Sequence, residues 1–143
     1  MRPSIGILGE YSPTFSPHAC TDTAIAHSNI ALGLEVTSEW VPTDDANVAL
    51  FAKHSGIWIG PGSPYKNMAR TLETIKHARG NGFPCFGTYG GFQHMILEYA
   101  RNVLGYRDAQ HAEYDPSASA LFISELECSL GGREMHLRLV PGS

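Results

Sequence analysis

Two glycine-rich segments each follow a short apolar run, and both could take part in chemistry. The first is Gly60-Pro-Gly-Ser-Pro64, and the second is Gly87-Thr-Tyr-Gly-Gly91. In an open parallel sheet, ligands bind beyond the carboxyl ends of the strands, where such loops and helix N-termini converge. Glycine lets the backbone come close to a ligand, so the first segment is predicted to turn an N–H group towards a ligand oxygen.

The second segment has the pattern of a nucleophile elbow. Small residues on both sides of Tyr89 allow a tight turn from a strand into a helix, with the central side chain exposed above the helix N-terminus. A purely structural turn fits the pattern equally well, because any tight strand-to-helix turn favours glycine. A phenol, with a reference pKa of about 10, is also a poor nucleophile near neutral pH.

The three cysteines are odd in number and far apart, which favours neither a disulfide framework nor a structural zinc site. Cys85 is interpreted as a small hydrophobic residue of the core. Cys20 is interpreted as an exposed residue without a functional role and is a weak candidate for a reactive thiol. Cys128 has no assignable context.

The histidines form no short paired motif with an adjacent acid, so no metal site is predicted and they are interpreted as scattered surface or packing residues. His94 and His111 lie close to the predicted site and are minor candidates for an acid or a base. The seven histidines are His18, His27, His54, His77, His94, His111 and His136.

Strands alternate with helices along the chain, which predicts a parallel sheet because parallel neighbours need a crossover connection. We expect a loop up to about Cys20 and then a helix that is capped by Thr21 or Asp22 and ends at Gly33. An apolar side of this first helix is predicted from Ala24, Ile25, Ile30, Ala31 and Leu32. Strands are expected at residues 5–9, 34–41, 56–59 and 84–87, and further helices at 44–51, from about 68 to 80, and from 90 to about 105.

The last helix is predicted to bury one side and to carry an ion pair between Glu98 and Arg101 on its surface. Beyond it we expect an irregular loop at residues 106–120, a short strand or helix at 121–126 and a strand at 135–140. The predicted buried side consists of Phe92, Ile96, Tyr99, Ala100 and Val103.

The 143 residues, 43% hydrophobic and 17% charged, suit one domain spanning residues 1–143. No run approaches the roughly 20 apolar residues that cross a bilayer, and no secretory signal is visible, so a cytoplasmic protein with reduced thiols is expected. The net charge of -4 and the scattered Lys and Arg residues disfavour nucleic-acid binding.

Residues 89–105 resemble the Cys-Leu-Gly-Met-Gln segment of CTP synthase and its Glu-Phe-Ala-Arg-Asn-Val-Leu-Gly stretch. Asp108-Ala109 and Glu113-Tyr-Asp-Pro116 resemble the family's Asp-Ala and Glu-Phe-Asp-Pro, and residues 6–11 resemble its first strand. The likeness covers most of the chain. It indicates a class I glutamine amidotransferase-like domain of the CTP synthase type, which implies a flavodoxin-like, three-layer α/β/α sandwich with a mostly parallel central sheet.

The resemblance also implies a changed catalytic apparatus. In the family a cysteine at the elbow attacks the glutamine amide, whereas Tyr89 stands at the matching position here. The family's activating histidine and glutamate lie in a His-Pro-Glu-type segment further along, and this chain ends at Ser143 before any such segment. His136 is followed by Leu137-Arg138, so it is not assigned the catalytic role. Ordinary glutaminase activity is therefore not expected.

The binding residues of the family have closer matches. Gly62 matches the second glycine of the oxyanion loop, although the residues around it differ from the family pattern. Gln93 matches the glutamine of the elbow helix and Glu113 the acidic residue of Glu-Phe-Asp-Pro, both of which hold glutamine in the family. A carboxylate that pairs with an α-ammonium and an amide that hydrogen-bonds the ligand are chemically compatible. A glutamine-like small molecule is the predicted ligand, and no cofactor is implied.

Three hypotheses follow. In the first, the chain is a non-catalytic amidotransferase-like protein that binds a glutamine-like molecule or a partner domain. In the second, it is an amidase, another hydrolase or a lyase with altered chemistry in the same pocket. In the third, it is a fragment truncated at its C-terminus, by proteolysis or at a stop codon that is normally recoded. A truncated sheet exposes an apolar edge, which makes a homodimer a secondary prediction. CTP formation is not expected, because no Gly-x-x-x-x-Gly-Lys-Ser/Thr pattern is present.

Overall fold

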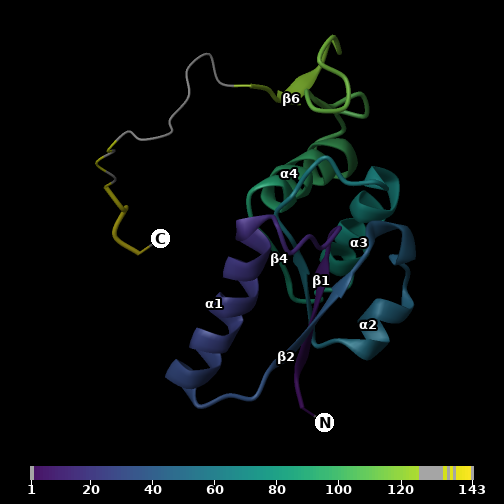
Figure 1. Ribbon diagram of the computed structural model, residues 1–143. Helices are drawn as coiled ribbons and strands as arrows, with labels where there is room; N and C mark the ends of the chain where they lie inside the picture. The colour runs from purple at the N-terminus through teal and green to yellow at the C-terminus, as the bar shows by residue number, and fades with distance from the viewer. Residues whose placement is uncertain (1, 126–133, 135, 137, 143) are drawn as a thin grey trace.

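A four-stranded parallel sheet organises the chain, and its strand order is β2-β1-β3-β4 (Figure 1). The structure is a computed structural model that describes residues 2–125, 134, 136 and 138–142. Parallel pairing and the alternation with helices confirm the fold class predicted from the sequence. The strands are β1 (Ser4–Leu8), β2 (Thr37–Val41), β3 (Gly56–Ile59) and β4 (Cys85–Gly87).

Helices flank both faces of this sheet, with α1 on one side and α2 and α3 on the other (Figure 1). The core lies on the α3 side, where Leu8 and Ile59 from the strands pack in one cluster with Ile75 and Leu97 from the helices. Each such side chain contributes roughly 1.5–3 kcal/mol when buried. The helices are α1 (Ser16–Leu32), α2 (Ala49–Lys53), α3 (Met68–Gly80) and α4 (Gly90–Asn102), with a short 3₁₀ turn η1 (Thr43–Asp45).

The first helix begins earlier than predicted and buries a different side. α1 begins at Ser16, and Pro17 occupies its first turn, where a missing N–H group removes no helical hydrogen bond. Of the predicted apolar side only Ile25 is buried, while Ile30 and Leu32 are 82% and 69% exposed. Polar residues of the first turns are buried instead. The predicted end at Gly33 is confirmed, with φ +64°.

Two predicted elements are shorter in the structure. The strand expected at residues 34–41 consists of Thr37–Val41, because the Asn29 side chain holds both backbone groups of Val36, at 2.8 and 3.0 Å. Leu34 N–H bonds back to Asn29 O at 2.9 Å and so belongs to the end of α1. The helix expected at residues 44–51 is split between η1 and α2.

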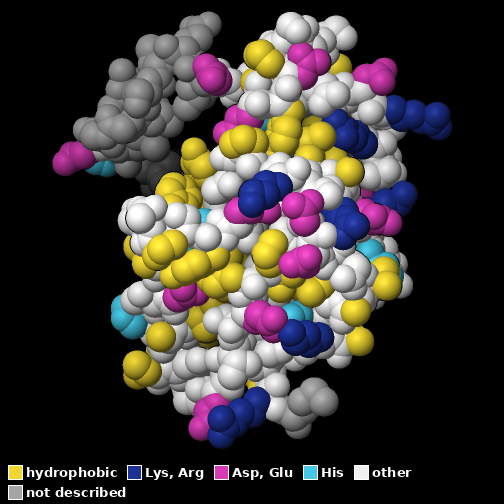
Figure 2. Space-filling model, turned by 45° about the vertical axis from the view of Figure 1, so that its right-hand side comes forward, with side chains coloured by type: hydrophobic (Ala, Val, Ile, Leu, Met, Phe, Trp, Pro, Cys, Tyr) yellow, Lys and Arg dark blue, Asp and Glu magenta, His cyan; other side chains and the backbone are white. Residues whose placement is uncertain are grey.

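The buried side of α4 was predicted wrongly apart from Ala100. Phe92, Ile96, Tyr99 and Val103 are exposed, and Figure 2 shows hydrophobic side chains lying open in patches among charged ones. The helix instead buries Gly90, Gly91, His94, Leu97, Glu98 and Ala100.

Glu98 does not pair with Arg101. Its carboxylate accepts two hydrogen bonds from Arg79 on α3, at 2.8 and 2.9 Å, and one from Asn102 at 3.2 Å. Arg101 donates to Ala109 O at 2.8 Å and to the Gln110 side chain at 3.0 Å. Because these partners satisfy both charged groups, the helix can bury polar residues where its hydrophobic pattern predicted apolar ones.

Beyond α4, two short strands, β5 (Gln110–His111) and β6 (Leu121–Ile123), form a separate parallel pair. This confirms a strand within the segment predicted at residues 121–126. Cys128 lies outside the described residues, and the strand predicted at 135–140 falls partly on such residues. In the described part of the chain, no helix is long and apolar enough to cross a membrane.

Candidate functional site

The predicted elbow is formed by the turn between β4 and α4. Tyr89 adopts φ +51° and ψ −118° and is 66% exposed at the tip. A positive φ is unfavourable for a tyrosine, and such strain costs about 1–3 kcal/mol where the surroundings impose it. The surroundings do so here: a Cβ atom at Gly91 would lie 2.0 Å from Ile59 O, and one at Gly90 would lie 2.5 Å from Ser63 Oγ.

The same close contacts bring the Gly60–Pro64 loop against the elbow. This loop follows β3, which pairs directly with β4, so both turns emerge at the same edge of the sheet. Gly62 has φ +107°, and a Cβ atom there would lie 3.0 Å from the Nε2 atom of His18. The structure therefore places the predicted oxyanion loop beside the elbow.

His18, which sequence reasoning left among the scattered histidines, supports this loop. Its buried ring accepts a hydrogen bond from Ser12 N at Nδ1, over 2.9 Å, and Nε2 lies 2.9 Å from Pro61 O. A carbonyl oxygen only accepts, so Nε2 carries the proton and donates it. Trp40 packs against the ring, with 4.5 Å between centroids. His18 thus fixes the position of Pro61, immediately before Gly62.

Gln93 and Glu113 are brought together by His111. His111 Nδ1 accepts from Glu113 N over 3.1 Å, so Nε2 carries the proton and donates to Gln93 Oε1, also over 3.1 Å. The same Nε2 atom lies 3.8 Å from the Glu113 carboxylate. Burial lowers the pKa of His111, and the charge of Glu113 opposes that effect.

This arrangement decides which groups remain for a ligand. His111 engages the carbonyl oxygen of Gln93, and within the described part of the chain no hydrogen bond engages its NH₂ group, which is left as a donor. The partly exposed Glu113 side chain offers carboxylate oxygens as acceptors. The two N–H donors of the Gln93 amide and the Glu113 carboxylate together suit a ligand that carries both a carbonyl or carboxylate oxygen and a cationic nitrogen. No pattern in the sequence pointed to His111 as the bridge.

A second buried network lies between the elbow helix and the loop after β3. His94 Nδ1 lies 2.7 Å from Gly90 O, and Nε2 lies 2.9 Å from the Tyr114 hydroxyl. That hydroxyl also accepts from Tyr65 N over 2.8 Å, and the Tyr65 hydroxyl donates to Gly60 O. Burial lowers the pKa of His94 to about 4 and raises that of Tyr114 to about 12.

The site offers little support for nucleophilic chemistry. Within the described part of the chain, no side chain hydrogen-bonds the Tyr89 hydroxyl, so none is placed to take its proton. Cys85 is half-buried and burial raises its pKa to about 11, in line with its interpretation as a small core residue, whereas Cys20 is exposed on α1. No three His, Cys, Asp or Glu side chains among the described residues gather as metal ligands.

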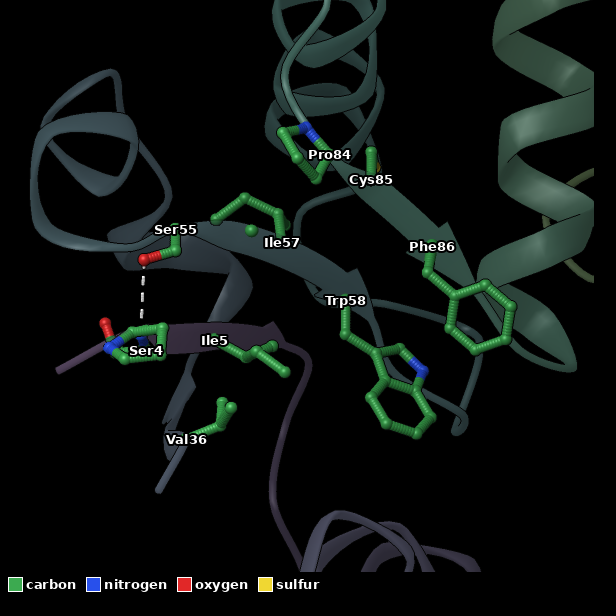
Figure 3. A pocket seen from close by; sticks show the side chains of 11 residues that line it. Ser4, Ile5, Val36, Ser55, Ile57, Trp58, Pro84, Cys85 and Phe86 are labelled. Carbon is green, nitrogen blue, oxygen red and sulfur yellow. Dashed lines mark hydrogen bonds between the residues drawn. The ribbon is translucent and has the colours of Figure 1, made fainter. Parts of the chain in front are cut away.

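A cavity of about 560 Å³ lies away from this site, on the α1 side of the sheet. Figure 3 shows Ile5, Trp58 and Phe86 projecting from three neighbouring strands to line it. Residues at the opposite strand ends, such as Ser55 and Pro84, also line it, so the cavity extends towards the end of the sheet that lies away from the elbow. Its lining is almost wholly apolar.

Comparisons with known proteins agree with this geometry. The family model of class I glutamine amidotransferases matches residues 19–134. The CTP synthase of Encephalitozoon cuniculi is 31% identical over 135 residues, which cover 94% of this chain and 25% of that protein. The CTP synthase of Archaeoglobus fulgidus is 32% identical over 134 residues, covering 92% of this chain and 25% of that protein.

Among solved structures, the glutaminase domain of Trypanosoma brucei CTPS with bound acivicin aligns with a TM-score of 0.70 at 21% identity. The match covers 82% of this chain and 48% of that one, and it confirms the fold. This chain spans about a quarter of the length of the two CTP synthases compared here. With the family model matched across most of its length, the chain belongs to the class I glutamine amidotransferase family, and CTP synthases are among its relatives.

Proposed function

We propose that this protein binds a glutamine-like amino acid and lacks ordinary glutaminase activity. The observation that carries the proposal is the cluster of Gln93, His111 and Glu113 beside the elbow. In this cluster His111 occupies the Gln93 carbonyl and so orients the Gln93 NH₂ group as a donor. The Glu113 carboxylate is the natural partner for an α-ammonium group. The solved structural relative carries bound acivicin, which supports a ligand site in this fold.

The same proposal assigns Tyr89 to the position of the family's nucleophilic cysteine. Its place at the tip of a strained strand-to-helix turn supports this assignment. A phenol without a neighbouring base forms no acyl intermediate comparable to a thioester, and loss of a nucleophile removes catalysis by factors of about a million in comparable enzymes. We therefore expect binding without ammonia release.

Isothermal titration with L-glutamine tests the proposal. The unaltered protein should bind L-glutamine, and glutaramate, which keeps the amide and lacks the ammonium group, should bind at least about tenfold more weakly. Glu113→Gln removes the charge at constant shape and should weaken L-glutamine by a similar factor. Glu73→Gln on the exposed surface of α3 is the matched control and should leave affinity unchanged. The ligand assignment would be refuted if neither glutamine nor glutamate gave a binding heat or raised the melting temperature.

We also propose that the protein forms a homodimer through the β4 edge. Among the described residues β4 pairs only with β3, so its outer edge is unpaired. Parallel sheets are also normally covered on both faces. Cys85 of β4 lines two apolar cavities, of about 560 and 360 Å³. Phe86 lines the larger one and is 57% exposed. Light scattering should give twice the monomer mass. Phe86→Lys should shift it to the monomer, and an unchanged mass would count against this interface.

A further inference from the structure

We propose that the Tyr114 hydroxyl is a positioning group that holds the elbow and the loop after β3 in one fixed arrangement. The hydroxyl lies where two hydrogen-bonded segments meet. On one side His94 connects it to Gly90, the residue that follows Tyr89, and on the other side it accepts from Tyr65 N. Tyr114 therefore joins the two turns that form the candidate site.

The direction of every hydrogen bond in this network follows from the chemistry of its members. Gly90 O can only accept, so the proton of neutral His94 lies on Nδ1 and Nε2 is an acceptor. The Tyr114 O–H must then donate to Nε2, and its oxygen accepts the Tyr65 N–H. Each polar group finds a partner in one orientation only. Exchanging the direction of any bond would leave two donors or two acceptors facing each other.

The same residue is also tied to the ligand-facing cluster. Tyr114 directly follows Glu113, and its own N–H donates to His111 O over 3.0 Å. The rings of His94 and His111 are 5.2 Å apart between centroids. A displacement of Tyr114 would therefore move both Glu113 and the loop after β3 relative to the elbow. This part of the inference rests on the proposed function, whereas the coupling of the two turns is measurable without a ligand.

Tyr114→Phe tests the inference, with Tyr106→Phe as the matched control because Tyr106 is exposed and packs against Phe122. Without the hydroxyl, His94 Nε2 loses the donor that favours its neutral form, so its ¹⁵N resonance should shift and its pKa should rise from about 4. Amide exchange at Tyr65 should become about tenfold faster or more. The control should change neither quantity.

The affinity for L-glutamine gives the functional readout. Tyr114→Phe should weaken it by about tenfold, the equivalent of one lost positioning hydrogen bond, while thermal unfolding shows that the variant remains folded. Unchanged His94 and Tyr65 signals would overturn the inference, and so would altered signals with unaltered affinity. If the unaltered protein binds no glutamine, the proposed function fails, and the two ligand-free signals alone decide whether Tyr114 couples the turns.

Discussion

Acidification should destabilise this protein largely through His94. Burial lowers the pKa of His94 to about 4 from its ordinary 6.5, helped by the nearby charges of His111 and Arg101 and opposed by Gly90 O and Glu113. The unfolded chain therefore binds this proton more readily than the folded one. The stabilisation is fully present above pH 6.5, declines as the pH falls, and is lost below the folded pKa.

The size of the effect follows from the difference between the two pKa values. At 1.36 kcal/mol per unit, a shift from 6.5 to about 4 corresponds to about 3 kcal/mol in the free energy of unfolding. That is a large share of the roughly 5–15 kcal/mol that holds a domain folded. Burial lowers the pKa values of His54 and His111 as well, so they add to the loss with the same sign.

Urea denaturation at pH 7.5 and pH 4.5 checks this reasoning. His94→Gln has no titrating group at this position, so its stability should fall between the two pH values by about 2–3 kcal/mol less than that of the unaltered protein. His27→Asn, at an exposed position of α1, should keep the full decrease. Carboxylates titrate alike in all three proteins and cancel in the comparison. An equal decrease in His94→Gln and the unaltered protein would refute the argument.

Three further predictions concern the frame of the site. Arg79→Ala should lower the free energy of unfolding by about 2 kcal/mol, measured in urea, because it leaves the buried Glu98 carboxylate without its cation; an unaltered midpoint would contradict this. Gly91→Ala should prevent stable folding by circular dichroism, since its Cβ would lie 2.0 Å from a backbone oxygen, whereas Gly80→Ala, with open space around it, should fold normally. Tyr89→Gly should raise the stability by about 1 kcal/mol by relieving the positive φ, and a lower melting temperature would show that the ring contributes more than the strain removes.

The hydrophobic pattern and the placement of glycines predicted the order of elements, because periodicity distinguishes helices from strands and glycines mark the turns between them. β3 was bounded correctly at Gly56–Ile59, a short apolar run after a polar turn. The face of α4 was missed because His94 and Glu98 are buried through specific partners on other segments. Hydropathy penalises such residues for burial and does not register the hydrogen bonds that compensate it.

The candidate site divides in the same way. The tight turn at Tyr89 followed from local glycine spacing, and the structure confirms that turn. Gln93 and Glu113 were proposed by resemblance, and the structure brings them together. His111 and His18 act through contacts between residues far apart in the sequence, with His18 bonding a carbonyl 43 positions away. No local pattern encodes such a contact, so their roles became visible only in the fold.

The crowding at Gly91 limits how the two turns of this site can move relative to each other. Its backbone lies so close to the Ile59 carbonyl that not even a methyl group fits between them, and Ser63 is packed against Gly90 in the same way. Neither turn can therefore move closer to the other without a clash. The Tyr89 side chain, 66% exposed at the tip of this packed turn, can change rotamer without disturbing the backbone contacts beneath it.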